Sequence, residues 1–148
     1  MSQSQSELPI LYRDEHLVAV HKPAGLLVHR SPIDRHETRF ALQLLRDQLG
    51  RRVYPVHRLD KPTSGVLLFG LTPEAARTMA SSFADGAVRK TYLAVVRGVP
   101  EQEGTIDHSL REEPDRLDYP ISQERGAQPA VTDYRRLASV ELPCAVGR

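Results

Sequence analysis

The sequence predicts an α+β domain with a mostly antiparallel or mixed sheet and two main helices. Short apolar runs bounded by turn residues indicate strands, and two longer stretches carry apolar residues at helical spacing. Strands grouped with two helices in this way are typical of α+β architecture. The length of 148 residues is that of one domain and is sufficient for a real core.

Two short strands are expected at the start of the domain. Residues 10–12 and 16–21 are apolar runs on either side of the polar turn Arg13-Asp14-Glu15. A Pro and a Gly in Lys22-Pro-Ala-Gly25 then favour a turn. After this turn, residues 26–29 are expected to continue in an extended conformation.

A first helix is expected at residues 38–49, after a polar loop at residues 30–37. Gly50 provides a natural C-terminal stop for this helix. The apolar positions of the helix fall on one face, which predicts packing against a core. These positions are Ala41, Leu44, Leu45 and Leu49.

A second helix has the stronger signal. Thr72 can cap its first turn, Pro73 suits its first position, and Gly86 ends it. Its apolar residues recur at helical spacing, and we expect the two largest, Met79 and Phe83, to lie in the core.

Three segments after this helix complete the expected fold. Residues 89–98 predict a long strand. Residues 101–126 are acidic and rich in turn residues, which predicts a hairpin with an exposed loop. Residues 130–137 alternate polar and apolar side chains, as expected of a half-buried strand.

The composition, 40% hydrophobic and 26% charged, is that of a soluble globular protein. The single Cys144 rules out an internal disulfide and a cysteine-based zinc site, and the six histidines show no metal-binding spacing. The longest strongly apolar run, residues 66–71, is far too short to span a membrane. Residues 1–7 are polar, so we expect a short disordered tail ahead of a domain at residues 8–148.

Charge is distributed unevenly along the chain. Residues 1–100 carry 14 Lys/Arg and 9 Asp/Glu, a net +5, whereas residues 101–148 carry 6 and 10, a net −4. The two parts sum to the overall +1. A basic first part is compatible with a phosphate-backbone partner, and it is equally compatible with an unevenly charged solvated surface.

The most informative stretch is His57-Arg-Leu-Asp-Lys-Pro-Thr-Ser-Gly65. It places the carboxylate of Asp60 in a short polar turn between two apolar segments, with Arg58 two residues earlier. Loops held by a scaffold in this way are where catalytic side chains concentrate. An aspartate before Pro-Thr-Ser-Gly is also a common turn-capping residue, so the turn alone does not decide between these interpretations.

The stretch resembles the HRLDxxTSG signature of the RluA-type pseudouridine synthases. Three further segments resemble motifs of this family, in the same order: KPxGxxVH at residues 22–29, KxYxAxVxG at 90–98 and AxTxYRxL at 130–137. The resemblance covers residues 8–148. Finer features, such as the loop Val28-His-Arg-Ser-Pro-Ile-Asp-Arg35, are similar to the tRNA pseudouridine-65 synthase branch.

The resemblance implies a function in RNA modification. Members of the family break the N-glycosidic bond of a uridine, rotate the base and rejoin it through carbon. No redox change occurs, so no cofactor is expected. The implied partner is tRNA, and a monomer in the cytoplasm without membrane attachment is the expected form.

The resemblance also implies roles for three residues. Asp60 is the implied catalytic residue, and its carboxylate is ionised at neutral pH because a free Asp has a pKa of about 3.9. Whether it attacks the sugar, attacks the base or removes a sugar proton is left open. Arg58 is implied to hold the RNA with the target base flipped out of its stack. Tyr92 is implied to be an active-site residue whose ring a base can stack on, and a half-buried strand tyrosine with no such role is the alternative.

The resemblance places a further segment after the Gly-Arg at 147–148, with a strand and a basic residue that pairs with the catalytic aspartate. The expected chain is therefore the N-terminal portion of a catalytic domain. Two alternatives to the synthase remain. One is a catalytically silent RNA-binding fragment that lacks the partner of Asp60. The other is a carboxylate-dependent hydrolase, which needs a second acid or base that the sequence does not identify.

Overall fold

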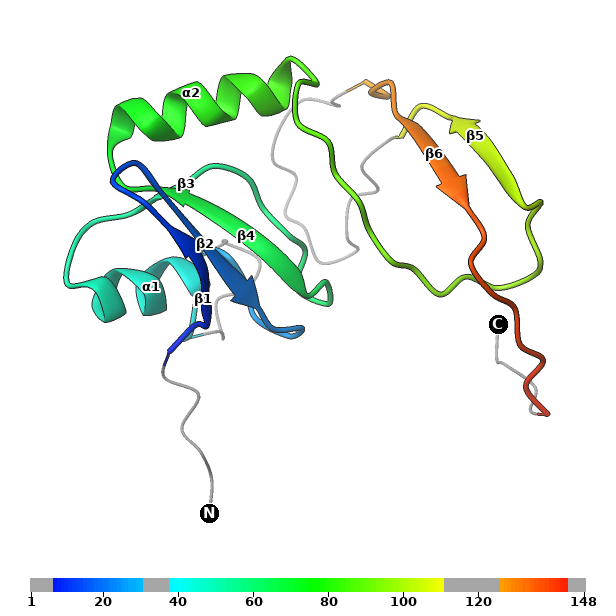
Figure 1. Ribbon diagram of the computed structural model, residues 1–148, viewed down its shortest axis with the longest axis horizontal. Helices are drawn as coiled ribbons and strands as arrows, with labels where there is room; N and C mark the ends of the chain where they lie inside the picture. Colours follow the sequence, from blue (N-terminus) through cyan, green and yellow to red (C-terminus); the bar gives the residue numbers. More distant parts are fainter. Residues whose placement is uncertain (1–6, 31–37, 111–125, 144–148) are drawn as a thin grey trace. The chain divides into compact units, whose positions relative to one another are not determined.

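The structure is a computed structural model that describes residues 7–30, 38–110 and 126–143. The chain divides into two compact units, Met1–Thr91 and Tyr92–Arg148, and each is described by itself (Figure 1). The expected tail at residues 1–7 and the expected loop at 30–37 fall almost entirely outside the described residues. No helix of the described residues is long and apolar enough to cross a membrane.

The first unit is built on a four-stranded sheet in the spatial order β1-β2-β4-β3 (Figure 1). All three strand pairings are antiparallel, which confirms the expected sheet type. The two opening strands are also confirmed, with ends that differ slightly from the expected ones. The bounds are β1 Ile10–Arg13, β2 Leu17–Lys22, β3 Tyr54–Pro55 and β4 Gly65–Gly70.

Asp14 shapes the turn between β1 and β2. Its carboxylate accepts hydrogen bonds from the backbone N–H groups of His16 and Leu17, both at 2.7 Å, and from the Tyr12 hydroxyl at 2.8 Å. The two backbone hydrogen bonds lower the pKa of Asp14 below its usual value because they stabilise the ionised form. The polar turn that the sequence predicts is therefore closed by its own aspartate.

The hydrophobic core lies on one face of this sheet. Because side chains alternate along a strand, Val18 and Val20 of β2 face the same side. They stand opposite Phe69 and Leu67 of β4, and all four side chains are fully buried. Helix α1 (Ala41–Leu49) covers this face with Ala41 and Leu45 and ends at Gly50, whose φ of 62° is left-handed. The predicted stop is confirmed.

Helix α2 (Pro73–Ala84) begins as the sequence predicts, since the Thr72 hydroxyl accepts a hydrogen bond from the backbone N–H of Ala75 at 3.1 Å. It passes close to β4 at Gly70, where an added Cβ would lie 2.7 Å from the backbone nitrogen of Ala76. No residue of α2 is fully buried, and Met79 and Phe83 are half-buried. The prediction that these two residues lie in the core is wrong, because the described residues cover only part of the inner face of α2.

The described residues of the second unit form one antiparallel strand pair, β5 (Glu103–Asp107) with β6 (Val131–Arg135). The strand expected at residues 130–137 is confirmed, but of the strand only Tyr134 is half-buried and the rest is exposed. The hairpin expected within residues 101–126 is wrong in its pairing, because β5 pairs with β6. Its expected loop, at 111–125, lies outside the described residues.

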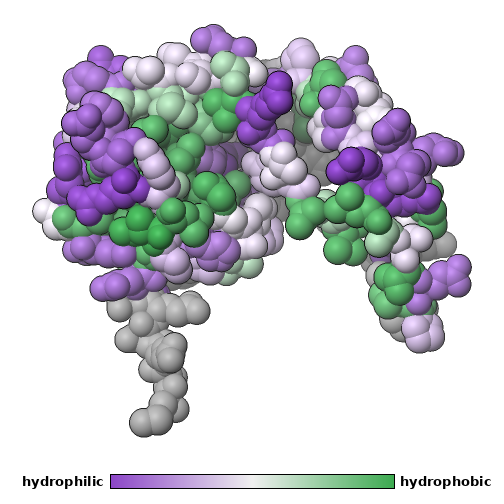
Figure 2. Space-filling model, in the orientation of Figure 1, coloured by the Kyte–Doolittle hydropathy of each residue, from purple (hydrophilic) through white to green (hydrophobic). Residues whose placement is uncertain are grey.

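The strand expected at residues 89–98 is also absent. This segment has no regular secondary structure and is exposed throughout. A strand needs a neighbour for its backbone hydrogen bonds, and the described residues pair none with this segment. Apolar side chains such as Leu93 and Val95 are 85% and 104% exposed, and Figure 2 shows hydrophobic surface on the visible face of this unit.

Candidate active site

The turn between β3 and β4 holds the two charged residues that the sequence singles out in its motif. Burial alternates along its first half: Leu59 is buried in the core, His57 is half-buried, and Arg58 and Asp60 are exposed. The inward residues attach the chain to the first unit, and the exposed ones carry the charge. The structure therefore brings Arg58 and Asp60 together on one anchored turn.

Asp60 keeps its carboxylate accessible. Its backbone carbonyl accepts a hydrogen bond from the N–H of Thr63 at 3.0 Å, which closes the turn at the start of Lys61-Pro62. Among the residues that the structure describes, none donates a hydrogen bond to the carboxylate oxygens of Asp60. An anion held on a fixed backbone, with its oxygens open, is suited to act as a nucleophile or a base.

Lys22 is a buried charged group that supports this turn through a hydrogen bond to its backbone. It follows Val18 and Val20 on the inward face of β2, and its side chain is 0% exposed. Its ammonium group donates hydrogen bonds to three carbonyl oxygens: Leu26 at 2.6 Å, Pro23 at 3.1 Å and Lys61 at 3.3 Å. Three donors meet three acceptors, so the buried ammonium is fully satisfied.

Burial lowers the pKa of Lys22, because desolvation disfavours the charged form, while the negative charge of Asp60 acts in the opposite direction. Lys22 and Asp60 therefore interact electrostatically through the turn. The Pro and Gly that follow Lys22 predict only a turn at this position. The available signal was the alternation of β2, in which a lysine occupies a position that the pattern assigns to an apolar residue.

The segments at residues 22–29 and 57–65, which both resemble family motifs, meet at the backbone carbonyl of Lys61. Besides the Lys22 ammonium, the backbone N–H of Gly25 donates a hydrogen bond to the Lys61 carbonyl at 2.7 Å. Gly25 has a φ of 83°, a conformation that favours glycine. The Lys22–Gly25 turn and the Asp60 turn are thus tied together although they are far apart in sequence.

His57 anchors the other side of the turn. Its Nε2 accepts a hydrogen bond from the backbone N–H of Leu68 at 3.2 Å. Its ring stacks on Phe83 of α2, with ring centroids 4.7 Å apart and an interplanar angle of 19°. Burial lowers the pKa of His57 from its usual 6.5, and the charge of Lys90 acts in the same direction. A backbone hydrogen bond at Arg58 opposes them.

Tyr92 belongs to the second unit, so the structure does not group it with Arg58 and Asp60. Its side chain is 59% exposed, on the segment that lacks regular secondary structure. An exposed ring is available for stacking. Its role as a base-stacking residue remains a prediction.

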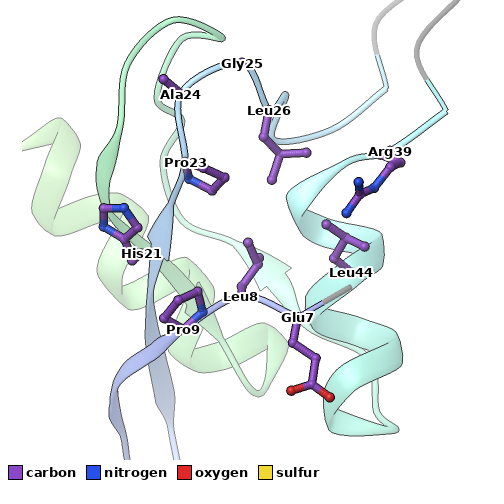
Figure 3. Close-up of a pocket in the computed structure, with 10 residues that line it drawn as sticks. All are labelled: Glu7, Leu8, Pro9, His21, Pro23, Ala24, Gly25, Leu26, Arg39 and Leu44. Atoms are coloured by element: carbon purple, nitrogen blue, oxygen red, sulfur yellow. The ribbon is translucent and has the colours of Figure 1, made fainter. Parts of the chain in front are cut away.

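A pocket of about 490 Å³ lies beside the Lys22–Gly25 turn. Figure 3 shows His21 and Pro23 on one side of it, Leu8 below, and Leu44 and Arg39 on the other side. Neither Arg58 nor Asp60 lines this pocket. It therefore shares the Gly25 backbone with the site but is not the place where Asp60 would act.

The described residues contain no group of three or more His, Cys, Asp or Glu side chains that could hold a metal ion. The site that they offer is made of an exposed carboxylate, an exposed guanidinium and a buried ammonium. Such a set suits acid–base or nucleophilic chemistry on an anionic partner.

Comparison with known proteins identifies a family that has this turn within the matched residues. The RNA pseudouridylate synthase family matches residues 16–144, which include both tied segments and most of each unit. The chain therefore belongs to the RNA pseudouridylate synthase family.

Curated relatives with higher sequence identity include two bacterial tRNA pseudouridine synthases C. The chain is 54% identical over 143 residues to the tRNA pseudouridine synthase C of Vibrio parahaemolyticus, and 53% identical over 142 residues to that of Haemophilus ducreyi. Each alignment covers 96% of this chain and 58% of the relative. The chain thus spans somewhat more than half the length of these relatives.

Solved structures support the fold at lower identity. Human RNA Pseudouridylate Synthase Domain Containing 4 matches with a TM-score of 0.68 and 29% identity. The match covers 89% of this chain and 54% of that one. Human RNA Pseudouridylate Synthase Domain Containing 1 matches with a TM-score of 0.65 and 28% identity.

Proposed function

We propose that residues 8–148 are the N-terminal portion of the catalytic domain of a tRNA pseudouridine synthase, with Asp60 as its catalytic residue. The observation that carries the proposal is the exposed carboxylate of Asp60 on a turn braced by buried Lys22. The identity of 54% to a tRNA pseudouridine synthase C supports tRNA as the substrate. The target is the uridine that gives the tRNA pseudouridine-65 branch its name.

The proposed isomerisation of uridine requires few groups besides Asp60 and Arg58. The isomerisation breaks a bond between carbon and nitrogen and forms one between the same sugar carbon and C5 of the same base, so it needs no oxidant and no cofactor. An ionised Asp60 supplies the nucleophile or the base. Arg58 lies two residues away and is exposed, where it can contact a phosphate or hold the flipped nucleotide.

Tyr92 supplies a flat, exposed ring against which the flipped uracil can stack. Stacking of a base on an aromatic ring is worth about 1–3 kcal/mol. A tRNA substrate also implies a cytoplasmic protein, and we expect it to act as a monomer.

A catalytically silent RNA-binding form is the second candidate. It is favoured by a segment at residues 89–98 that has no partner strand among the described residues. This form would bind tRNA through its basic first part but would lack the full set of groups around Asp60. Both candidates would bind tRNA, but only the synthase would convert its uridine to pseudouridine.

The deciding experiment compares two polypeptides on tRNA labelled with tritium at C5 of uridine. One is the 148-residue chain, and the other joins it to the portion of the Vibrio parahaemolyticus relative that the match leaves uncovered, which the family resemblance places after residue 148. Because C5 loses its hydrogen when it bonds to the sugar, released tritium counts each isomerisation. We expect release by the extended polypeptide and much less by the shorter one.

Two outcomes would revise the proposal. Full activity of the 148-residue chain would show that its own residues suffice. Tight tRNA binding by both polypeptides without tritium release would favour the silent form.

A further inference from the structure

His57 occupies the point where β3 stops pairing with β4. The two strands pair Tyr54 with Gly70 and Pro55 with Phe69, so the next pair in register is Val56 with Leu68. The backbone N–H of Val56 donates to the Leu68 carbonyl at 3.3 Å, as the ladder requires. The N–H of Leu68 donates instead to Nε2 of His57, at 3.2 Å.

An imidazole thus replaces a backbone carbonyl as the last acceptor of the ladder. The replacement satisfies the Leu68 N–H while the backbone of residues 57–60 leaves the sheet and forms the turn. The ring is held in two directions, by its edge on β4 and by its face on Phe83 of α2, 4.7 Å away. Leu59, buried in the core, is the next attachment point of the chain.

We propose that His57 is a positioning residue for Asp60 and that it acts as a neutral hydrogen-bond acceptor. Asp60 lies three residues after His57 and one after Leu59, so the path of the chain to its carboxylate depends on these two attachments. The inference rests on the proposed function for its catalytic consequence. Its structural content, the placement of Asp60 by the imidazole, can be measured without turnover.

The neutral form is required because Nε2 must offer a lone pair to an N–H group. Protonation would place a second N–H against the N–H of Leu68 and break the hydrogen bond. The groups around the ring favour the neutral form on balance. Burial and the charge of Lys90 lower the pKa of His57, and the Phe83 ring of α2 that stacks on it carries no charge. The backbone hydrogen bond at Arg58 acts the other way.

Two variants separate the hydrogen bond from the ring contact. His57→Gln places a carbonyl oxygen the same number of bonds from the backbone as Nε2, so it keeps an acceptor. His57→Phe keeps an aromatic ring against Phe83 but has no acceptor. A role in packing alone would be preserved better by Phe, and a role as acceptor would be preserved better by Gln.

The first measurement is NMR on the 148-residue chain and both variants. Ring nitrogen shifts report which nitrogen of His57 carries the proton, amide exchange reports the Leu68 N–H, and the side-chain carboxyl carbon reports Asp60. We expect an unprotonated Nε2 at neutral pH. We also expect faster exchange at Leu68 and a shifted Asp60 signal in His57→Phe, with both restored in His57→Gln.

The second measurement is the pH profile of kcat and KM in the polypeptide that is active on tRNA. We expect His57→Phe to lower kcat by about 10- to 100-fold, the usual cost of a misplaced catalytic group, with KM almost unchanged. The wild type should lose kcat as the pH falls below 6.5, because the pKa of His57 lies under that value and His57 then takes up a proton. That loss should be absent in His57→Gln.

The proposal fails if His57→Phe leaves Leu68 exchange and the Asp60 signal as in the wild type, or if His57→Gln is as impaired as His57→Phe. These results are distinct from failure of the proposed function. A wild-type polypeptide that forms no pseudouridine would refute the assigned reaction, while the NMR measurements would still decide whether His57 places Asp60.

Discussion

The ammonium nitrogen of Lys22 lies 3.3 Å from the carbonyl oxygen of Lys61, the residue directly after Asp60. The same carbonyl accepts the N–H of Gly25, so two segments nearly forty residues apart converge on one atom. Lys22 thus holds the turn that presents Asp60, and it does so from a fully buried position. The interaction fixes backbone geometry and leaves the carboxylate of Asp60 accessible.

Replacement of Lys22 should destabilise this turn. Lys22→Met keeps the volume of the side chain but removes the ammonium donor from three carbonyl oxygens. The Lys61 carbonyl keeps the N–H of Gly25, so the carbonyls of Pro23 and Leu26 lose their donor. An unsatisfied buried polar group costs about 1–3 kcal/mol, and relief of the desolvation of the ammonium offsets part of this. We expect the free energy of unfolding to fall by about 2 kcal/mol in urea titrations. Arg13→Met, on the exposed β1, is the matched control, and an equal effect of both variants would contradict the bracing role.

The contact between β4 and α2 should not tolerate a side chain at Gly70. An added Cβ would lie 2.7 Å from the backbone nitrogen of Ala76, and backbone cannot yield as a flexible side chain can. We expect Gly70→Ala to lower the unfolding free energy by about 1–3 kcal/mol, as overpacking commonly does. Gly126→Ala has open space around its Cβ and serves as the control. Thermal unfolding of the two variants measures the difference, and equal midpoints would refute the close contact.

Arg58→Ala should weaken tRNA binding more than it disturbs the fold, because its side chain is exposed and Leu59 and His57 do the anchoring. Loss of one phosphate or base contact costs about 1–3 kcal/mol. Filter binding over a series of salt concentrations should give a shallower salt dependence for the variant than for the wild type, since each phosphate contact releases counterions. The exposed Arg77 on α2 provides the control, as Arg77→Ala. Identical affinities and salt slopes for Arg58→Ala and wild type would remove Arg58 from the RNA interface.

Tyr92→Ala should lower turnover on tRNA, because the flipped base loses its stacking surface. Stacking is worth about 1–3 kcal/mol per base, which corresponds to roughly 5- to 150-fold. The side chain is exposed, so the stability of the fold should hardly change. Tritium release together with a urea titration tests both points. Unchanged turnover would leave Tyr92 as an ordinary exposed residue.

The sequence predicted β1, β2 and both helices of the first unit because these elements are specified locally, whereas it predicted no strand at β3 or β4. Two apolar runs around an aspartate turn gave β1 and β2, and a Thr-Pro start with a C-terminal Gly gave the bounds of α2 to within a few residues. Local signals sufficed here because each element finds its partner within the same unit. The sheet and its helix α1 then enclose Val18, Val20 and their neighbours.

The predictions that depended on distant partners were less accurate. Residues 89–98 have the composition of a strand, but a strand forms only where another strand accepts its hydrogen bonds, and composition does not reveal this. Phe83 has the spacing of a core residue, yet its ring stacks on His57 at the surface of the sheet. The Pro and Gly that follow Lys22 predict a turn there, and only its three carbonyl partners explain why this lysine is buried.

Asp60→Asn is the most direct test of the central claim. The amide keeps the shape of the side chain but can serve neither as nucleophile nor as base. The variant and the wild type should be compared in the polypeptide that is active on tRNA, with Asp47→Asn as an exposed control. The measurement is tritium released from C5-labelled uridine in tRNA, beside tRNA affinity. We expect release to be abolished in Asp60→Asn with affinity and fold retained, and sustained release by pure Asp60→Asn would contradict the role assigned to Asp60.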